Sequence, residues 1–406
     1  MNDMTKLQPM PWKTTVDESK LPPLPPIPRR RYLDEDFYQL ELKHVWRKVW
    51  LLVGHETEYE KPGSYRLLDL DLAPVVVVRG KDMKIRAFLN SCQHRGATVL
   101  KEKEGCAPVM SCQYHGWTYS LEGKLVGVTQ PDTFPHLNPG DYDLPELRCE
   151  QWGGLIFINF DKEAQPLREF LTKSVLDRYS PIFESPLRVV WRHAWDFNCN
   201  WKLPTDAFRE AYHIETIHKK TVFQMIDCQR ATTDMNHNGH DTITVPYWPK
   251  QAMQEGEWDA IPVLSKLAPL PLAATPEFTA NVIEPNIFPN FSMAFQGVGF
   301  PIFSFWPVSV DRSRVEVLWL GVDWGDAPKS AEWETLIAGS SIVAEEDLGN
   351  LMSIQKSLAA DPDKGIPLAT KEIAIYQLHA EIDRLIGPEN IAPELRVPDI
   401  LRDFYA

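Results

Sequence analysis

Two short pairs of cysteine and histidine carry the most distinctive chemistry in this sequence. Cys92 and His94 form a Cys-x-His pair, and Cys112 and His115 form a Cys-x-x-His pair. Both pairs adjoin strand-like runs, so we expect them on loops at the tip of a small β domain. Two thiolates and two imidazoles make a complete ligand set for one compact metal site.

Two kinds of site accept this ligand set. In a Rieske [2Fe–2S] cluster the thiolates hold one iron and the histidines hold the other, whereas a structural zinc takes all four in a tetrahedron. Zinc-finger spacing keeps the cysteines together and the histidines together, but here the two types alternate. The order therefore favours an iron–sulfur cluster. Cys106, between the pairs, is predicted to be an ordinary core thiol.

A second candidate metal site lies farther along the chain. His213 and His218 are five positions apart, so a regular helix would not place them on one face unless it ended or bulged between them. Two histidines with one carboxylate form the facial triad of non-haem Fe(II) oxygenases. Glu345, Glu346 and Asp347 are candidates for the carboxylate, and chemistry alone does not choose among them.

The elements around these motifs indicate an α+β fold in more than one domain. The chain has 406 residues, enough for two or three domains. A proline-rich run at 21–28 is expected to form an extended arm, and apolar spacing predicts a helix over 34–50. Short β-like runs fill 51–161, including a hairpin of 75–79 with 84–89. Farther on, helix-like segments (207–217, 331–358, 370–386) alternate with β-like runs (187–197, 300–308, 314–322).

Composition excludes several classes of protein. With 42 basic and 56 acidic residues the net charge is −14, which argues against nucleic-acid binding. The N-terminus lacks the pattern of a secretory signal, and glycine and proline interrupt the most apolar stretch, 293–310, so no membrane helix is expected. Six cysteines are too sparse for a disulfide scaffold, so we expect a cytoplasmic protein.

Together the two motifs resemble those of Rieske non-haem iron oxygenases, the α subunits of aromatic ring-hydroxylating type. The loops His-Arg-Gly at 94–96 and Tyr-His-Gly-Trp at 114–117 resemble the family's Rieske domain. Asn-Trp-Lys at 200–202 and the segment 210–218, Glu-Ala-Tyr-His followed by the second histidine, resemble its catalytic motif. The similarity runs from about Asp34 to Ile386 in the expected order.

This resemblance implies a division of the chain into three parts. Residues 1–46 would form an N-terminal arm and helix that pack with the catalytic domain. Residues 47–165 would form a small all-β Rieske domain, and residues 166–406 a larger α+β catalytic domain with an antiparallel sheet flanked by helices.

The resemblance also implies the ligands. Cys92 and Cys112 would hold one iron of the [2Fe–2S] cluster, and His94 and His115 the other. The mononuclear Fe(II) would be bound by His213, His218 and Asp347; the family's aspartate is followed two helical turns later by a glutamine, here Gln355. Glu210 would bridge the two kinds of metal site across a subunit boundary.

Two departures leave the substrate open. The bridging residue is more often aspartate than glutamate, and glutamate also occurs there in relatives that act on quaternary amines. Asp206-Ala207 stands where the family commonly has Glu-Asn. A further open point is the aromatic group in the second domain, which could line a substrate pocket or simply form core. Its members are Phe295, Phe300, Phe303, Phe305 and Trp306.

The function implied is that of a terminal oxygenase that hydroxylates an organic substrate, expected to be aromatic, with O2. No flavin or nicotinamide motif is found, so NAD(P)H would act through a separate reductase, with or without a ferredoxin. The assembly would be a homotrimer or larger, with or without a β subunit. The alternatives are a monooxygenase for N- or O-demethylation or quaternary amine oxidation, and, more remotely, an electron carrier or redox sensor without oxygenase activity.

Overall fold

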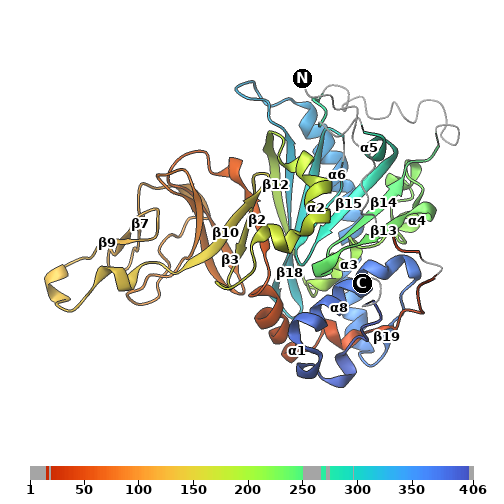
Figure 1. Cartoon of the computed structure of the whole chain (residues 1–406), viewed down its shortest axis with the longest axis horizontal. Coiled ribbons are helices and arrows are strands. Elements are labelled where there is room, and N and C mark those ends of the chain that lie inside the picture. The colour runs from red at the N-terminus through yellow and green to blue at the C-terminus, as the bar shows by residue number, and fades with distance from the viewer. Residues whose placement is uncertain (1–14, 18–19, 250–266, 271–274, 296, 402–406) are drawn as a thin grey trace.

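The computed structural model describes residues 15–17, 20–249, 267–270, 275–295 and 297–401. A small β unit stands beside a larger unit of helices and sheet (Figure 1). Each unit is built around a seven-stranded antiparallel sheet, which confirms the predicted α+β class. Within the described residues, no helix is both long and apolar enough to cross a membrane.

The small unit holds two sheets, with strand orders β2-β11-β10-β5-β4-β3-β6 and β7-β8-β9. The predicted hairpin is β4 with β5, paired from Val75↔Leu89 to Arg79↔Ile85. The strands are β2 (Leu51–His55), β3 (Ser64–Leu70), β4 (Ala73–Arg79), β5 (Ile85–Leu89), β6 (Glu104–Cys106), β7 (Met110–Ser111), β8 (Thr118–Tyr119), β9 (Leu125–Gly127), β10 (Glu146–Trp152) and β11 (Leu155–Asn159).

Strand β4 separates two cores. Because successive side chains of a strand point to opposite faces, Val75 and Val77 enter the large core that runs into the second unit. Val76 and Val78 enter a smaller core that also contains Cys92 and Cys112. The loops with the first candidate site are therefore anchored on one face of this sheet.

The prediction that Cys106 is a core thiol is wrong. This residue ends β6, an edge strand that among the described residues pairs only with β3 and whose three residues are all exposed. Its thiol donates to the carbonyl oxygen of Pro62 at 3.6 Å. The strand is too short and too far at the edge for another element to cover it.

The larger unit has the strand order β12-β18-β17-β16-β15-β14-β13. Its strands are β12 (Leu187–Phe197), β13 (Thr232–Met235), β14 (Asp241–Pro246), β15 (Asn281–Ile287), β16 (Phe291–Met293), β17 (Gly299–Ser309) and β18 (Arg312–Val322). Its helices are α2 (Leu167–Phe183), α3 (Lys202–Ala207), α4 (Ile214–Ile217), α5 (Pro276–Ala280), α6 (Glu332–Leu348), α7 (Leu351–Ala360) and α8 (Ile373–Ile386). The predicted strands at 187–197, 300–308 and 314–322 correspond to β12, β17 and β18.

Two predicted helices are interrupted. The segment 207–217 is not one helix, because α3 ends at Ala207 and α4 begins only at Ile214. The segment 331–358 is divided between α6 and α7 at Gly349 and Asn350. Both interruptions lie next to candidate ligands, and the first places His213 and His218 at the two ends of the short helix α4.

The N-terminal segment is fastened to the larger unit. Strand β1 (Ile27–Pro28) pairs with β19 (Gly365–Ile366), and α1 (Glu35–Glu41) continues as a π-helical turn to Trp46, short of the predicted end at residue 50. Arg31 is fully buried and donates to Asp383 at 2.7 Å and to the carbonyl oxygen of Leu395 at 2.6 Å.

A second buried ion pair joins α1 to α3. Glu41 and Lys202 are both fully buried, with Nζ and Oε1 2.7 Å apart. The indole N–H of Trp201 donates to the other carboxylate oxygen at 3.0 Å. The start of the segment that carries the histidines is therefore positioned by the N-terminal helix.

Candidate metal centres

The two Cys-His loops have the same backbone geometry. In the first loop the N–H of Cys92 donates to the carbonyl oxygen of Ala97 at 2.8 Å, and the N–H of Gly96 donates back to Cys92 at 2.8 Å. The second loop repeats both bonds between Cys112 and Trp117, and between its glycine and Cys112, at 2.8 and 2.9 Å. The two cysteines and the two glycines therefore stand at matching positions, whereas the histidine comes two residues after the cysteine in the first loop and three after it in the second.

The four side chains of these loops fit an iron–sulfur cluster. Cys92 and Cys112 are buried, whereas His94 and His115 are partly exposed. The centroids of the two imidazole rings lie 4.7 Å apart. Nδ1 of His94 is buried and has no hydrogen-bond partner in the part of the chain that the structure describes, which is costly unless a ligand satisfies it. Burial also raises the pKa of the Cys92 thiol, so the thiolate needs a nearby cation such as iron.

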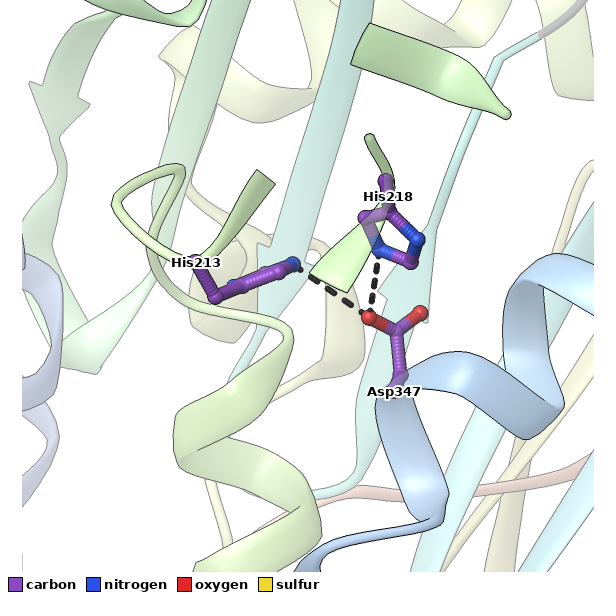
Figure 2. A group of neighbouring side chains, drawn as sticks. All are labelled: His213, His218 and Asp347. Carbon is purple, nitrogen blue, oxygen red and sulfur yellow. Dashed lines mark hydrogen bonds and ion pairs between the residues drawn. The ribbon is translucent and has the colours of Figure 1, made fainter. Parts of the chain in front are cut away.

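The second site brings together the three predicted ligands of the mononuclear iron. Figure 2 shows His213 and His218 directed at Asp347 on α6. One Asp347 oxygen lies 3.3 Å from Nε2 of His213 and 2.7 Å from Nε2 of His218. In the described part of the chain, this is the one group of three potential ligand atoms that lie within 4.8 Å of one another. Among the three acidic candidates, the structure turns Asp347 toward both histidines, whereas Glu345 is exposed.

Two further carboxylates hold the other nitrogen of each ring. Nδ1 of His213 donates to Glu210, whose second oxygen accepts the backbone N–H of His213 at 3.0 Å. Nδ1 of His218 donates to Glu346 at 2.8 Å, and the Thr221 hydroxyl donates to the same oxygen at 2.7 Å. Because each Nδ1 is occupied, each Nε2 is left to bind a metal. Sequence reasoning missed this role of Glu346, whose only signal is its place beside Asp347.

Charge in this site favours a metal cation. Burial disfavours the charged form of His213, but hydrogen bonds to Asp347 and Glu210 raise its pKa to about 10. Burial likewise opposes protonation of His218, and Asp347 outweighs it and raises that pKa. The pKa of Asp347 is lowered, against the effect of burial, by hydrogen bonds to both histidines. Protons therefore occupy positions that a metal ion can take, so the three residues fit Fe(II) chemically.

Another carboxylate near this site was not indicated by any motif. Glu284 lies on β15 and is partly exposed. Burial raises its pKa to about 7, and the charges of His213 and Asp347 also act on it. The residue comes from a strand far from the histidines in sequence, so only the folded sheet reveals its position.

The aromatic group forms part of the hydrophobic core, and Gln355 links two segments of the chain. Phe295, Phe300, Phe303, Phe305 and Trp306 are all buried within the two largest cores, which agrees with the core interpretation. On α7, the side-chain oxygen of Gln355 accepts the N–H of Asn200 at 3.0 Å, and its amide donates to Tyr32 at 3.2 Å. Gln355 thus joins the N-terminal segment to the start of the histidine-bearing region.

Two protein families match this chain. The family described as "Rieske [2Fe-2S] domain" matches residues 49–142, which supports an iron–sulfur cluster over zinc at the four Cys and His residues. The family described as "Ring hydroxylating alpha subunit (catalytic domain)" matches residues 184–387.

Several curated proteins are similar in sequence. The chain is 40% identical over 198 residues to the benzene 1,2-dioxygenase alpha subunit of Pseudomonas putida, covering 47% of this chain and 43% of that protein. It is 40% identical over 195 residues to the chlorobenzene dioxygenase alpha subunit of a Cupriavidus species, covering 46% and 43%. The alignment thus spans less than half the length of these relatives. The chain is 28% identical over 305 residues to the 2-aminobenzenesulfonate 2,3-dioxygenase alpha subunit of an Alcaligenes species. That alignment covers 73% of this chain and 74% of that protein.

Solved structures share the fold. Naphthalene 1,2-dioxygenase from a Rhodococcus species bound to indole superposes with a TM-score of 0.74 at 23% identity, covering 90% of this chain and 95% of that one. The quaternary ammonium Rieske monooxygenase CntA with L-carnitine gives 0.71 at 20% identity, covering 88% and 94%. At these identities the likeness shows the fold alone.

Proposed function

The chain belongs to the family of ring-hydroxylating alpha subunits with a Rieske domain, and from that premise we propose that it is a terminal oxygenase that hydroxylates an aromatic substrate with O2. The observation that carries the proposal is the convergence of His213, His218 and Asp347, with both Nδ1 atoms held by other carboxylates. Two neutral nitrogens and one carboxylate leave coordination positions open for O2.

Under this proposal each part of the site has a task. His213, His218 and Asp347 would hold an Fe(II) ion, which when bound would supply the chemistry of O2 activation. Glu346 fixes the tautomer of His218. Glu210 binds Nδ1 of His213, and we propose that it also contacts a cluster histidine of a neighbouring copy, which would link the two metal sites.

The proposal extends to the rest of the system. Cys92, His94, Cys112 and His115 hold the [2Fe–2S] cluster within residues 47–165, and residues 166–406 form the catalytic domain with the arm 1–46 packed on it. A separate reductase, with or without a ferredoxin, passes electrons from NAD(P)H in the cytoplasm. The assembly is a homotrimer or larger, with or without a β subunit.

A single turnover tests the proposed reaction. Chemically reduced protein loaded with Fe(II) is exposed to O2 and a panel of aromatic hydrocarbons, aromatic acids, methoxyarenes and quaternary amines, and the products are read by mass spectrometry. A gain of two oxygens and two hydrogens means dioxygenation. Cluster oxidation that needs no substrate and yields no product would favour the electron carrier instead.

A matched variant separates the two classes. His213→Ala removes one proposed iron ligand and leaves the Cys-His loops untouched. We expect it to retain the visible spectrum of the cluster and to lose product formation. A variant that forms product normally would refute the assignment of the iron site.

Monooxygenation is the second candidate function. The observation that favours it is Glu210, the longer acidic residue at the proposed bridge, which is hydrogen-bonded to His213 as a bridge requires. In the same single turnover, incorporation of one oxygen or loss of a methyl group would identify this reaction.

A further inference from the structure

Strand β15 directs alternate side chains to two different environments. Ile283 and Ile287 point into the large core that also contains residues of α1 and α2. Val282, on the opposite face, packs against the cluster that includes Ala211 and Ile214, the two residues that flank the Tyr212-His213 step. Because side chains two positions apart share a face of a strand, Glu284 points the same way as Val282, toward the histidines.

Pairing with the neighbouring strand confirms this direction. Glu284 lies opposite Ile243 of β14, and residues directly opposite on antiparallel strands project to the same side of the sheet. Ile243 belongs to the same cluster as Ala211 and Ile214. Two independent neighbours, one along the strand and one across it, therefore place the Glu284 side chain on the face of the metal site.

Glu284 differs from the other carboxylates of the site in having no partner. Glu210 binds His213, Glu346 binds His218 and Thr221, and Asp347 contacts both histidines. The Glu284 side chain makes no hydrogen bond or ion pair with any residue in the described ranges, although it is only partly exposed. A carboxylate withdrawn from water without a partner is costly, and a bound cation offsets that cost.

The site carries an excess of negative charge, which also favours binding of a cation. When a divalent iron is bound and both histidines are neutral, its two positive charges face the carboxylates of Glu210, Glu346 and Asp347, and Glu284 adds a fourth negative charge when it is ionised. The nearby guanidinium of Arg209 does not correct this excess, since it is buried in an ion pair with Asp241. Lys371 donates instead to the carbonyl oxygens of Cys228 and Gln229.

We infer that Glu284 is a specificity-determining residue that pairs with a positively charged nitrogen of the substrate. The inference rests on the proposed function, since it concerns the molecule that this site oxidises. An ammonium group held at β15 would fix one end of the substrate, and the remainder would lie toward the histidines. Neutral aromatic hydrocarbons would then bind more weakly than aromatic or aliphatic amines of the same shape.

A pair of isosteric probes tests the inference. The cation is 4-hydroxyphenyl-trimethylammonium, and 4-tert-butylphenol is the neutral compound of the same shape. Binding of each to the iron-loaded full-length protein is measured by calorimetry. We expect the wild type to bind the cation about tenfold more tightly or better, the gain typical of one charge-assisted contact.

Three variants complete the comparison. Glu284→Gln keeps the shape of the side chain and removes its charge, so the preference for the cation should disappear. Glu345→Gln makes the same change at an exposed position beside Asp347, and it should bind both probes as the wild type does. Circular dichroism and iron content verify that the variants are folded, and Glu284→Asp, which keeps the charge, should retain a preference.

The outcomes separate this inference from the proposed reaction. Equal affinity of the wild type for the two probes, or an unchanged preference in Glu284→Gln, would overturn the inference, whether or not aromatic compounds are oxygenated. Conversely, cation binding that depends on Glu284, with no oxygen transferred to any panel compound in a single turnover, would refute the oxygenase proposal and support Glu284 as the cation-binding residue.

Discussion

At the scale of single residues, the contact of Glu346 with His218 leads to a prediction about metal affinity. Glu346→Ala removes the acceptor that holds Nδ1 of His218 and frees Thr221, while Asp347 remains. Loss of such a supporting contact typically weakens metal binding by about 10- to 100-fold. We expect that loss in a competition for Fe(II) against a coloured chelator.

Glu345 offers the matched control for this measurement. Glu345→Ala changes the neighbouring exposed glutamate and should leave the affinity for Fe(II) unchanged. If both variants lost affinity equally, the effect would come from the general negative charge of the helix end, and the orienting role of Glu346 would be wrong.

His240 makes the stability of the larger unit depend on pH. Burial lowers its pKa to about 3, while Nδ1 accepts the N–H of Phe288 at 3.1 Å and Nε2 donates to Phe170 at 2.8 Å. The folded state therefore stays unprotonated where the unfolded chain, with a pKa of about 6.5, takes up a proton. This contribution is complete above about pH 6.5 and is lost as the pH falls toward about 3.

The expected loss is about 2 kcal/mol between about pH 7 and about pH 5. His240→Gln removes the titrating group, so its unfolding free energy should be lower at neutral pH but should fall less steeply over that window. Urea unfolding of both proteins at several pH values measures the two slopes. Parallel slopes would show that other groups cause the acid sensitivity.

Local spacing in the sequence identified the two Cys-His pairs and the pair of His213 and His218, whereas Asp347 was singled out only by the resemblance to a known family. Cysteine and histidine lie only a few positions apart in each loop, so their proximity needs no knowledge of the fold. Glu346 and Glu284 differ, because their importance depends on which way α6 and β15 face. Cys106 was misjudged for the same reason, since burial of a thiol is a property of its neighbours in space.

At the scale of elements, the two Cys-His loops allow a comparison of matching glycines. Gly96 and Gly116 have φ values of +76° and +72°, so alanine at either position costs roughly 1–2 kcal/mol of backbone strain. A Cβ at position 116 would also lie 2.7 Å from Oγ1 of Thr129, whereas at position 96 the nearest atom is 4.0 Å away. Gly116→Ala should therefore lose the cluster more readily than Gly96→Ala.

The absorbance of the cluster during a thermal ramp measures this difference. We expect the signal of Gly116→Ala to disappear at a lower temperature than that of Gly96→Ala, and both below the wild type. Thr129→Ala restores space at position 116 and should recover part of the loss. The reverse order of the two glycine variants would contradict the steric argument.

The lengths of the helices were less predictable than the existence of the strands. Strand β12 matches its predicted bounds, because β-branched and aromatic residues recur along it: Val189, Val190, Trp191, Trp195 and Phe197. The helix expected over 207–217 is broken by a side chain, since Glu210 accepts the backbone N–H groups of Tyr212 and His213. The spacing of apolar residues does not reveal hydrogen bonds of this kind. The break in the helix allows His213 and His218 to lie close together.

At the scale of the whole molecule, the buried pair of Glu41 and Lys202 connects the N-terminal helix to the catalytic unit. Glu41→Gln leaves the ammonium of Lys202 buried without its counter-charge, which typically costs about 3–5 kcal/mol. As a control, Lys48→Met removes a solvent-exposed pair with Asp161 and should cost less than about 1 kcal/mol. Urea unfolding followed by tryptophan fluorescence compares the variants, and equal shifts would refute the claim that the buried pair holds the two parts together.

The buried ion pair of Arg31 has a consequence for the order in which parts of the protein can assemble during translation. Its partner Asp383 is synthesised 352 positions later, so this ion pair forms only after nearly all of the chain has emerged. The four cysteine and histidine residues of the small β unit are synthesised by position 115, long before that point. The three residues of the second centre are complete only once Asp347 has emerged, so the ribosome releases the cluster ligands well before the iron ligands.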